Sequence, residues 1–275
     1  MTLASAMLIA IAACSSTTDL SLDESRTHQL VGLEMKKLGQ LVTGVRMAGP
    51  IEFNGLLPSS FVFGSVCGVR SNTDDTDGNG VPNDLTLSFR LPACRTSSGI
   101  LETDLLGAVR FQDLGGRWGV RLTYNSLWQV KRTLSGPNEF TVAHLATGGM
   151  ELRYLSDSAI EIHDFVVRVD SIVGATGQAI TERRFNIRST YRGAVTVHPF
   201  GLLQPVQRIN VDGWFTLVRR TATTVDSSRF DLATTVPLEH TQFEFCRSPF
   251  SSGTLKVRAT GKLKATVDVK FTCGF

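Results

Sequence analysis

Residues 72–84 form the internal segment whose side chains are best suited to chemistry, Asn-Thr-Asp-Asp-Thr-Asp-Gly-Asn-Gly-Val-Pro-Asn-Asp. From Asp75 they follow the pattern D-x-D-x-N-G, in which oxygen ligands alternate before a glycine that permits a sharp turn. Because calcium takes about six to eight oxygen ligands, this spacing predicts a calcium site whose role is to order the loop. The same residue types also form tight, solvated turns, so a plain hairpin turn is the alternative interpretation.

The loop resembles the Asp-rich calcium loops of EF-hands, dockerins and thrombospondin type 3 repeats. The ligands that this resemblance implies are the side chains of Asp75, Asp77 and Asn79, the carbonyl of Val81, and Asn83 directly or through water. The closing acidic ligand of an EF-hand falls on Thr86 in this sequence. Asp84 would therefore have to take its place, in a different loop geometry.

The first residues of the chain predict its location. Residues 1–13 carry no charge and end in Ile11-Ala12-Ala13, directly before Cys14. An apolar run of this length cannot span the roughly 30 Å of a bilayer core as a helix, but it suits the apolar core of a secretory signal. The tetrapeptide resembles the lipobox of bacterial lipoproteins, in which the signal is removed before the cysteine and the cysteine is acylated. A buried N-terminal helix with an incidental cysteine is the alternative.

The lipoprotein resemblance implies a signal peptide over residues 1–13, a lipidated Cys14 and a tether of small polar residues over 14–23. Ser15 follows the cysteine, and in that family a residue other than aspartate at this position favours the outer membrane. The folded body, residues 24–275, is then expected as a single domain in the periplasm or on the cell surface. Its expected partners are the membrane, through the anchor, and a lipid or an envelope protein.

The remaining cysteines are Cys67, Cys94, Cys246 and Cys273. An even number in an oxidising compartment predicts two disulfides. The favoured pairs are Cys67–Cys94 and Cys246–Cys273, because each joins neighbouring segments across the same separation. Four reduced thiols or a metal site are the alternatives, although the lack of Cys-x-x-Cys spacing disfavours structural zinc.

Apolar residues recur at helical spacing between Asp23 and Ala48, namely Val31, Met35, Leu38, Val42 and Val45, with Leu30 and Leu41 beside them. Lysine, glutamine and arginine occupy the opposite side, so the segment predicts an amphipathic helix. Its three glycines each cost about 1 kcal/mol relative to alanine, and the helix is therefore expected to gain stability by packing on a sheet. A helix lying in a membrane interface is the alternative.

From Phe61 onward the apolar residues recur with period two. The clearest runs are Leu85-Leu87-Phe89-Leu91, Trp118-Val120-Leu122-Tyr124, Phe165-Val167-Val169, Phe215-Leu217, Leu255-Val257-Ala259 and Val267-Val269-Phe271. Glycine, proline, asparagine and aspartate separate them, as expected for short antiparallel strands with one buried face. The sequence thus predicts a mainly-β fold, a large curved antiparallel meander or partly open barrel with one N-terminal amphipathic helix packed on it.

Composition and motifs favour a protein without catalytic activity. A net charge of +3 is too small to indicate a nucleic-acid partner. The sequence contains no nucleophile elbow, zinc-protease motif or nucleotide-binding glycine pattern. Carboxylates such as Glu161, Asp164 and Asp170 could form a glycosidase pair, but nothing in the linear sequence selects them. No cofactor other than calcium is expected.

These observations favour a non-catalytic, membrane-anchored envelope lipoprotein with a structural, adhesive or assembly role. The alternative is a carrier that holds a lipid or other amphiphile in the concave face of the sheet. Its cavity would be lined by Trp118, Leu122, Trp128, Phe165 and Phe215. An outer-membrane β-barrel, whose last strand the C-terminal alternation resembles, or a hydrolase is the third possibility.

Overall fold

The structure, a computed structural model, describes residues 21–44, 67, 69–71, 74–78, 82–92, 94–98, 101–115, 119–133, 140–156, 159–174, 177–197, 203–240 and 250–273. Within them lie one helix, α1 (Leu22–Gly44), and thirteen strands. The first strands are β1 (Val69–Arg70), β2 (Asp84–Phe89), β3 (Arg95–Ser98), β4 (Leu101–Asp113), β5 (Gly119–Thr133) and β6 (Thr141–Ser156). The others are β7 (Ala159–Asp164), β8 (Val167–Gly174), β9 (Gly177–Val197), β10 (Leu203–Arg220), β11 (Val225–His240), β12 (Ser252–Gly261) and β13 (Ala265–Lys270).

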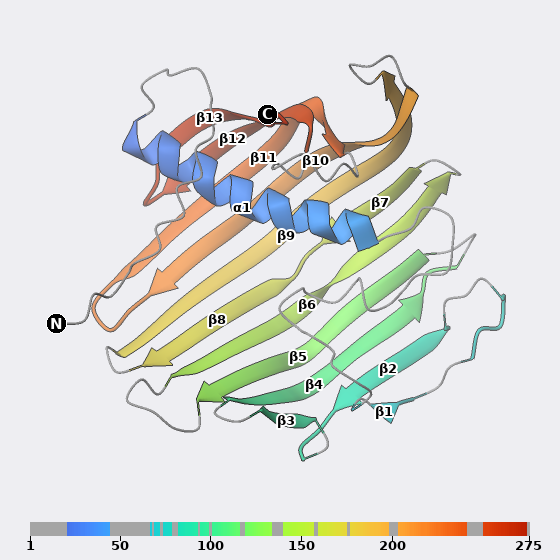
Figure 1. The fold of residues 1–275 in the computed structure, drawn as a ribbon, viewed down its shortest axis with the longest axis vertical. Coiled ribbons are helices and arrows are strands. Elements are labelled where there is room, and N and C mark those ends of the chain that lie inside the picture. Colours follow the sequence, from blue (N-terminus) through green and yellow to red (C-terminus); the bar gives the residue numbers. More distant parts are fainter. Residues whose placement is uncertain are drawn as a thin grey trace.

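The strands form one antiparallel sheet in which neighbours in sequence are neighbours in space (Figure 1). The order is β1-β2-β4-β5-β6-β7-β9-β10-β11-β12-β13, with β3 pairing β4 beyond the end of β2. β7 and β8 both lie between β6 and β9, one after the other, and therefore act as a single strand with a kink at Phe165 and Val166. The predicted mainly-β meander with one packed helix is confirmed, as an open sheet and not as a closed barrel.

Alternation of side chains gives the sheet two distinct faces. In β13, Val267 and Val269 are buried whereas Asp268 and Lys270 are exposed. Residues that stand opposite each other in antiparallel strands share a face, so the register extends this division across the sheet. We call the face of Val267 and Val269 the inner face and the other the outer face.

The helix α1 lies across the inner face, and Figure 1 shows it running from β13 towards β7. A capping box begins the helix, because the backbone amide of Ser21 donates to Glu24 Oε2 over 2.7 Å and the amide of Glu24 donates to Ser21 Oγ. Val31 and Met35 are fully buried in the core that the inner face forms. The helix starts within one residue of the prediction, and residues 45–48 of the predicted helix lie outside the described residues.

Stacked aromatic rings fill the inner face over β9, β10 and β11. Phe215 stands opposite Phe185 on one neighbouring strand and Phe230 on the other, and its ring centroid lies 5.9 Å and 4.6 Å from theirs. Both pairs are stacked and all three side chains are buried. This part of the inner face is therefore a packed core.

Ion pairs between neighbouring strands cover the outer face. Arg95 and Arg132 both bind Asp104, with nitrogen–oxygen distances of 2.7 Å, and Arg121 binds Glu151 over 2.6 Å. The three arginine side chains are about two-fifths exposed and keep this face charged, whereas Asp104 and Glu151 lie beneath them, 1% and 14% exposed.

The predicted disulfide between Cys67 and Cys94 is confirmed. It ties the segment before β1 to the turn between β2 and β3. Cys273, just after β13, is also disulfide-bonded. Cys246 lies outside the described residues, so its predicted pairing with Cys273 stays a prediction.

Candidate functional site

Ionisable side chains gather on the inner face where the later part of α1 meets the middle of the sheet. We call them the polar cluster: Glu34, His144, Asp164, Arg168, Asp170 and Arg183. Strand register brings four of them together, because His144 stands opposite Asp170 and Arg168 stands opposite Arg183. The fifth, Asp164, ends β7 and lies close to Arg168. The sixth, Glu34, comes from α1.

One part of the cluster is a chain of charge pairs. His144 Nδ1 lies 2.7 Å from Asp170 Oδ1, and the guanidinium of Arg183 donates to the other oxygen of Asp170. Arg183 Nε lies 3.1 Å from Glu34 Oε1, so this arginine joins the sheet to the helix. Burial raises the pKa of Asp170, but the hydrogen bonds from His144 and Arg183 outweigh it and hold the pKa below its ordinary value of 3.8.

The other part is a looser pair of Asp164 and Arg168. Asp164 Oδ1 accepts a hydrogen bond of 3.1 Å from the amide of Val166, at the kink between β7 and β8. Arg168 Nη2 lies 3.5 Å from Asp164 Oδ2, beyond ordinary hydrogen-bond distance. Burial raises the pKa of Asp164, and the charge of Arg168 only partly opposes this. The guanidinium lies over the ring of Phe185, 5.0 Å from its centroid.

Two buried polar atoms of the cluster and its surroundings find no hydrogen-bond partner among the described residues, Arg168 Nε and Gln129 Oε1. Beside them the side chains of Ser189 and Tyr191 interact with each other. Gln129, Ser189 and Tyr191 are almost fully buried and stand at inner-face positions of β5 and β9. Burial also raises the pKa of Tyr191, which keeps its phenol a neutral donor. Buried groups of this kind normally have a hydrogen-bond partner, so Arg168 Nε and Gln129 Oε1 are unusual features of this face.

Removal of one carboxylate tests how tightly the cluster is organised. We expect Asp170→Asn to lower the free energy of unfolding by about 2 kcal/mol, because it leaves Arg183 and His144 without their shared anion. The lowered pKa of Asp170 means that its contribution is present above its ordinary value of 3.8 and is lost as the pH falls through the lower, folded value. Asp170→Asn should therefore flatten the acid side of the stability profile.

The measurement is urea unfolding at a series of pH values, with Asp231→Asn as the matched control. Asp231 pairs with Arg229 on the outer face, and both side chains are more than two-fifths exposed. Such an exposed pair contributes about 0–1 kcal/mol, so the control should unfold like the parent. Equal losses in the two variants would show that the polar cluster is not a buried, coupled unit.

The structure places part of the predicted calcium loop. Asp75 Oδ1 accepts a 2.9 Å hydrogen bond from the amide of Gly78, and Asn83 bonds to Thr76. Both carboxylate oxygens of Asp84 are bound by Arg110, which also holds the pKa of Asp84 below its ordinary value. In this structure Asp84 is therefore ion-paired with Arg110, and its predicted role as a calcium ligand stays a prediction.

Asp77 is exposed, and Asn79 and Val81 lie outside the described residues. Over the described ranges, no group of three or more histidine, cysteine or acidic residues is arranged to hold a metal. Calcium binding therefore stays a prediction.

Calcium at this loop is tested by thermal unfolding. If the loop binds the ion, calcium should raise the melting temperature of the parent protein, because a ligand of the folded state stabilises it by mass action. Asp77→Ala should abolish that gain, whereas Asp226→Ala, in an exposed ion pair with Lys262 at the start of β11, should keep it. A parent protein whose melting temperature does not respond to millimolar calcium would leave the plain turn as the correct interpretation.

The aromatic and aliphatic residues predicted to line a cavity do not share one face. Leu122 and Phe215 are buried on the inner face. Trp128, next to the inward-facing Leu127, lies on the outer face and is partly exposed. Phe165 lies against outer-facing His163, with ring centroids 5.3 Å apart. Trp118 lies outside the described residues, so the four that are placed divide evenly between the two faces.

The sequence pattern also predicted the wrong facing for the side chains of β8. Its alternation suggested that Val167 and Val169 face the core, yet Arg168 and Asp170 are the inward residues. The reason is continuity with β7, whose Ile162 is buried on the inner face, because the even-numbered positions keep that direction past the kink. The apolar residues of β8 therefore lie on the outer face, and its sequence pattern did not predict that its charged residues lie on the inner face.

Three carboxylates were named from the sequence as possible members of a glycosidase pair. Asp164 and Asp170 belong to the polar cluster, whereas Glu161 faces outward opposite Arg153. His163 and Asp164 point to opposite faces, as predicted for neighbours in a strand. Glu34 was missed, although a signal existed. It is a lone carboxylate within the apolar stripe of the helix, between Val31 and Met35.

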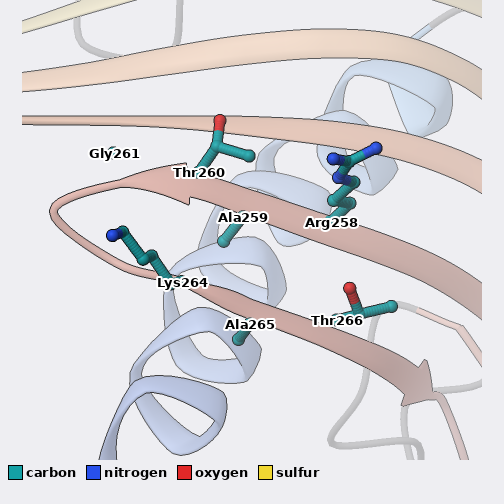
Figure 2. Close-up of a pocket in the computed structure, with 7 residues that line it drawn as sticks. All are labelled: Arg258, Ala259, Thr260, Gly261, Lys264, Ala265 and Thr266. Atoms are coloured by element: carbon teal, nitrogen blue, oxygen red, sulfur yellow. The ribbon is translucent and has the colours of Figure 1, made fainter.

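A hollow lies at the turn between β12 and β13 (Figure 2). Its lining residues are Arg258, Ala259, Thr260, Gly261, Lys264, Ala265 and Thr266. It is shallow and open, and the amide of Lys264 is bound by Asp23 at the start of α1. We assign it no role in binding.

Comparison with protein-family models, with curated proteins and with solved structures finds no match for this chain. In the part of the chain that is described, no helix has both the length and the apolar character needed to cross a bilayer. Function must therefore be argued from the site itself.

Proposed function

We propose that this protein is a non-catalytic, lipid-anchored carrier that binds an amphiphile on the inner face of its sheet, beneath and beside α1. The observation that supports it is the polar cluster, a group of buried and half-buried charges with unpartnered polar atoms, set into an otherwise apolar face. A head group would satisfy the polar atoms, and an apolar chain would lie on the surrounding side chains.

The inner face also offers apolar surface next to the cluster. Ile172 stands two positions beyond Asp170 on the same face and is 51% exposed. Its cross-strand neighbour Val142 is half-buried. The packed rings around Phe215 fill the other side of the face, so binding is confined to the region from the cluster towards Ile172.

The contacts between α1 and the sheet suit a helix that can move aside. Its polar contacts with the sheet include the pair of Glu34 with Arg183, midway along the helix, and the bond of Asp23 to Lys264 at its start. Over residues 22–35, the part of the helix whose side chains are described, the buried apolar side chains are Val31 and Met35. A lid held in this way can admit a ligand without unfolding the sheet.

The anchor remains a proposal from the sequence, because Cys14 lies outside the described residues. If it is acylated, the carrier works at a membrane surface, with the outer membrane as the favoured site. The disulfide of Cys67 with Cys94 supports an oxidising compartment for the folded body.

The decisive experiment is native mass spectrometry of the membrane-extracted protein, followed by solvent extraction and lipid analysis. The proposal expects acyl groups on the chain, loss of residues 1–13, and a separate amphiphile bound in stoichiometric amount. A folded protein that carries no amphiphile, and that takes up no fluorescent fatty acid at micromolar concentration, would overturn the carrier and leave the structural role. Cys14→Ser should remove the acyl groups but keep the bound amphiphile.

A further inference from the structure

We infer that Arg168 and Arg183 bind the anionic head group of the amphiphile, and that Glu34 occupies this position as an internal substitute when no ligand is bound. The inference rests on the proposed carrier function. It adds the chemical class of the ligand, an amphiphile with a compact anionic head such as a phosphate or carboxylate, and the way in which α1 opens.

The first argument is the placement of two arginines side by side. Arg168 and Arg183 stand directly opposite each other on neighbouring strands and point to the same face. Like charges in such a pair repel each other, so the arrangement needs anions between or beside them. Planar guanidinium groups are also the side chains best shaped to bind phosphate or carboxylate oxygens.

The second argument is that Arg168 is incompletely neutralised. Its Nε is buried without a partner in the described structure, and its contact with Asp164 is 3.5 Å long. Burial raises the pKa of that carboxyl group, and the 3.5 Å separation makes it a weak partner for Arg168. Arg168 therefore presents a positive charge and a free donor to the inner face, both of which an anionic head group would satisfy.

The third argument is that Glu34 already behaves as a bound anion. It is a buried carboxylate within the apolar stripe of α1, and it meets Arg183 Nε at 3.1 Å. Asp170 holds the same guanidinium from the sheet side, so Arg183 stays in position when Glu34 leaves. A ligand anion and Glu34 thus compete for one cation, and binding of the ligand releases the helix at this point.

The test is isothermal titration calorimetry on the full chain in a neutral detergent at one fixed concentration. Decyl phosphate, decanol and inorganic phosphate are titrated separately, so that the contributions of the head group and of the alkyl chain to the affinity are measured separately. We expect decyl phosphate to bind about tenfold more tightly than decanol, as one charge-assisted contact allows. Inorganic phosphate, which lacks the chain, should bind far more weakly than decyl phosphate.

Two variants test the roles of Arg168 and Glu34 in head-group binding, and a third serves as the control. Arg168→Gln should weaken decyl phosphate about tenfold and leave decanol unchanged, because only the charged contact is lost. Glu34→Gln should tighten decyl phosphate several-fold, since the internal competitor is gone. Arg229→Gln is the matched control, because Arg229 lies over Trp214 on the outer face, and it should change neither ligand. Hydrogen exchange in α1 should rise with decyl phosphate and not with decanol.

The outcomes separate the two proposals. If neither amphiphile binds the folded parent protein, the carrier function fails. If decyl phosphate and decanol bind equally, or if Glu34→Gln fails to tighten decyl phosphate, the carrier survives and this inference is overturned. Inorganic phosphate that binds as tightly as decyl phosphate also overturns it, in favour of a free-anion site. Should Arg168→Gln not fold, the isosteric Glu34→Gln decides alone.

Discussion

Phe215→Ala is expected to lower the free energy of unfolding by about 4 kcal/mol, the typical cost of removing a large aromatic side chain from a core. Phe215 is only 1% exposed and its ring stacks between those of Phe185 and Phe230. The sheet is open, and no second sheet is available to close over the space within the described residues. The cavity would therefore remain, and two aromatic contacts would be lost with it.

The measurement is urea unfolding followed by circular dichroism, with Val236→Ala as the control. Val236 belongs to β11, which also carries Phe230, but it is 51% exposed and its truncation should cost well under about 1 kcal/mol. Phe215→Leu should give an intermediate loss, since most of the volume is kept. If Phe215→Ala cost no more than Val236→Ala, the rings would not be the packed core of this half of the sheet.

The sheet could be predicted because its strands are simple in sequence. In β13 the alternation of Val267 and Val269 with Asp268 and Lys270 gives both the strand and its facing, and the structure confirms both. The meander also follows from the sequence, since short turns join antiparallel neighbours. No repeat or long linker suggested any other order, and the strands pair in chain order.

The polar cluster could not be predicted in the same way, because it depends on register. Asp170 is 26 residues from His144 and 13 from Arg183, and no motif links them. They meet because each falls at an inward position of its own strand. A shift of one residue in any strand would turn its member outward, and sequence patterning does not set register to that accuracy.

The same uncertainty in strand register explains why the predicted cavity residues do not share one face. Trp128 and Phe165 were chosen for their size and apolar character, which do not say which face they occupy. A bulge opposite Gly107 shifts the register between β4 and β5, so Leu127 rather than Trp128 points inward. Gly107 has a φ of +103°, which few other residues adopt, and the backbone oxygen of Ser126 leaves no room there for a Cβ.

Removal of the disulfide by the double substitution of Cys67 and Cys94 with alanine is expected to lower the free energy of unfolding by about 3–4 kcal/mol. The two cysteines are 27 residues apart, and cross-linking a loop of this length restricts the unfolded chain by about that amount on the chain-entropy model. Chemical unfolding of parent and variant under oxidising conditions measures it. An unchanged midpoint would contradict the entropic contribution of this bond.

A reductant provides the control, because reduced parent protein and the alanine variant both lack the bond. Cys273 is also disulfide-bonded, so reductant should lower the stability of the variant further, by the contribution of that second bond alone. The parent should lose the sum of both contributions, provided that the bonds constrain separate loops. Losses of this size would support our proposal of an oxidising compartment for the folded body, the location that the lipobox resemblance before Cys14 predicts. Parent protein that is equally stable with and without reductant would remove that support for an envelope location.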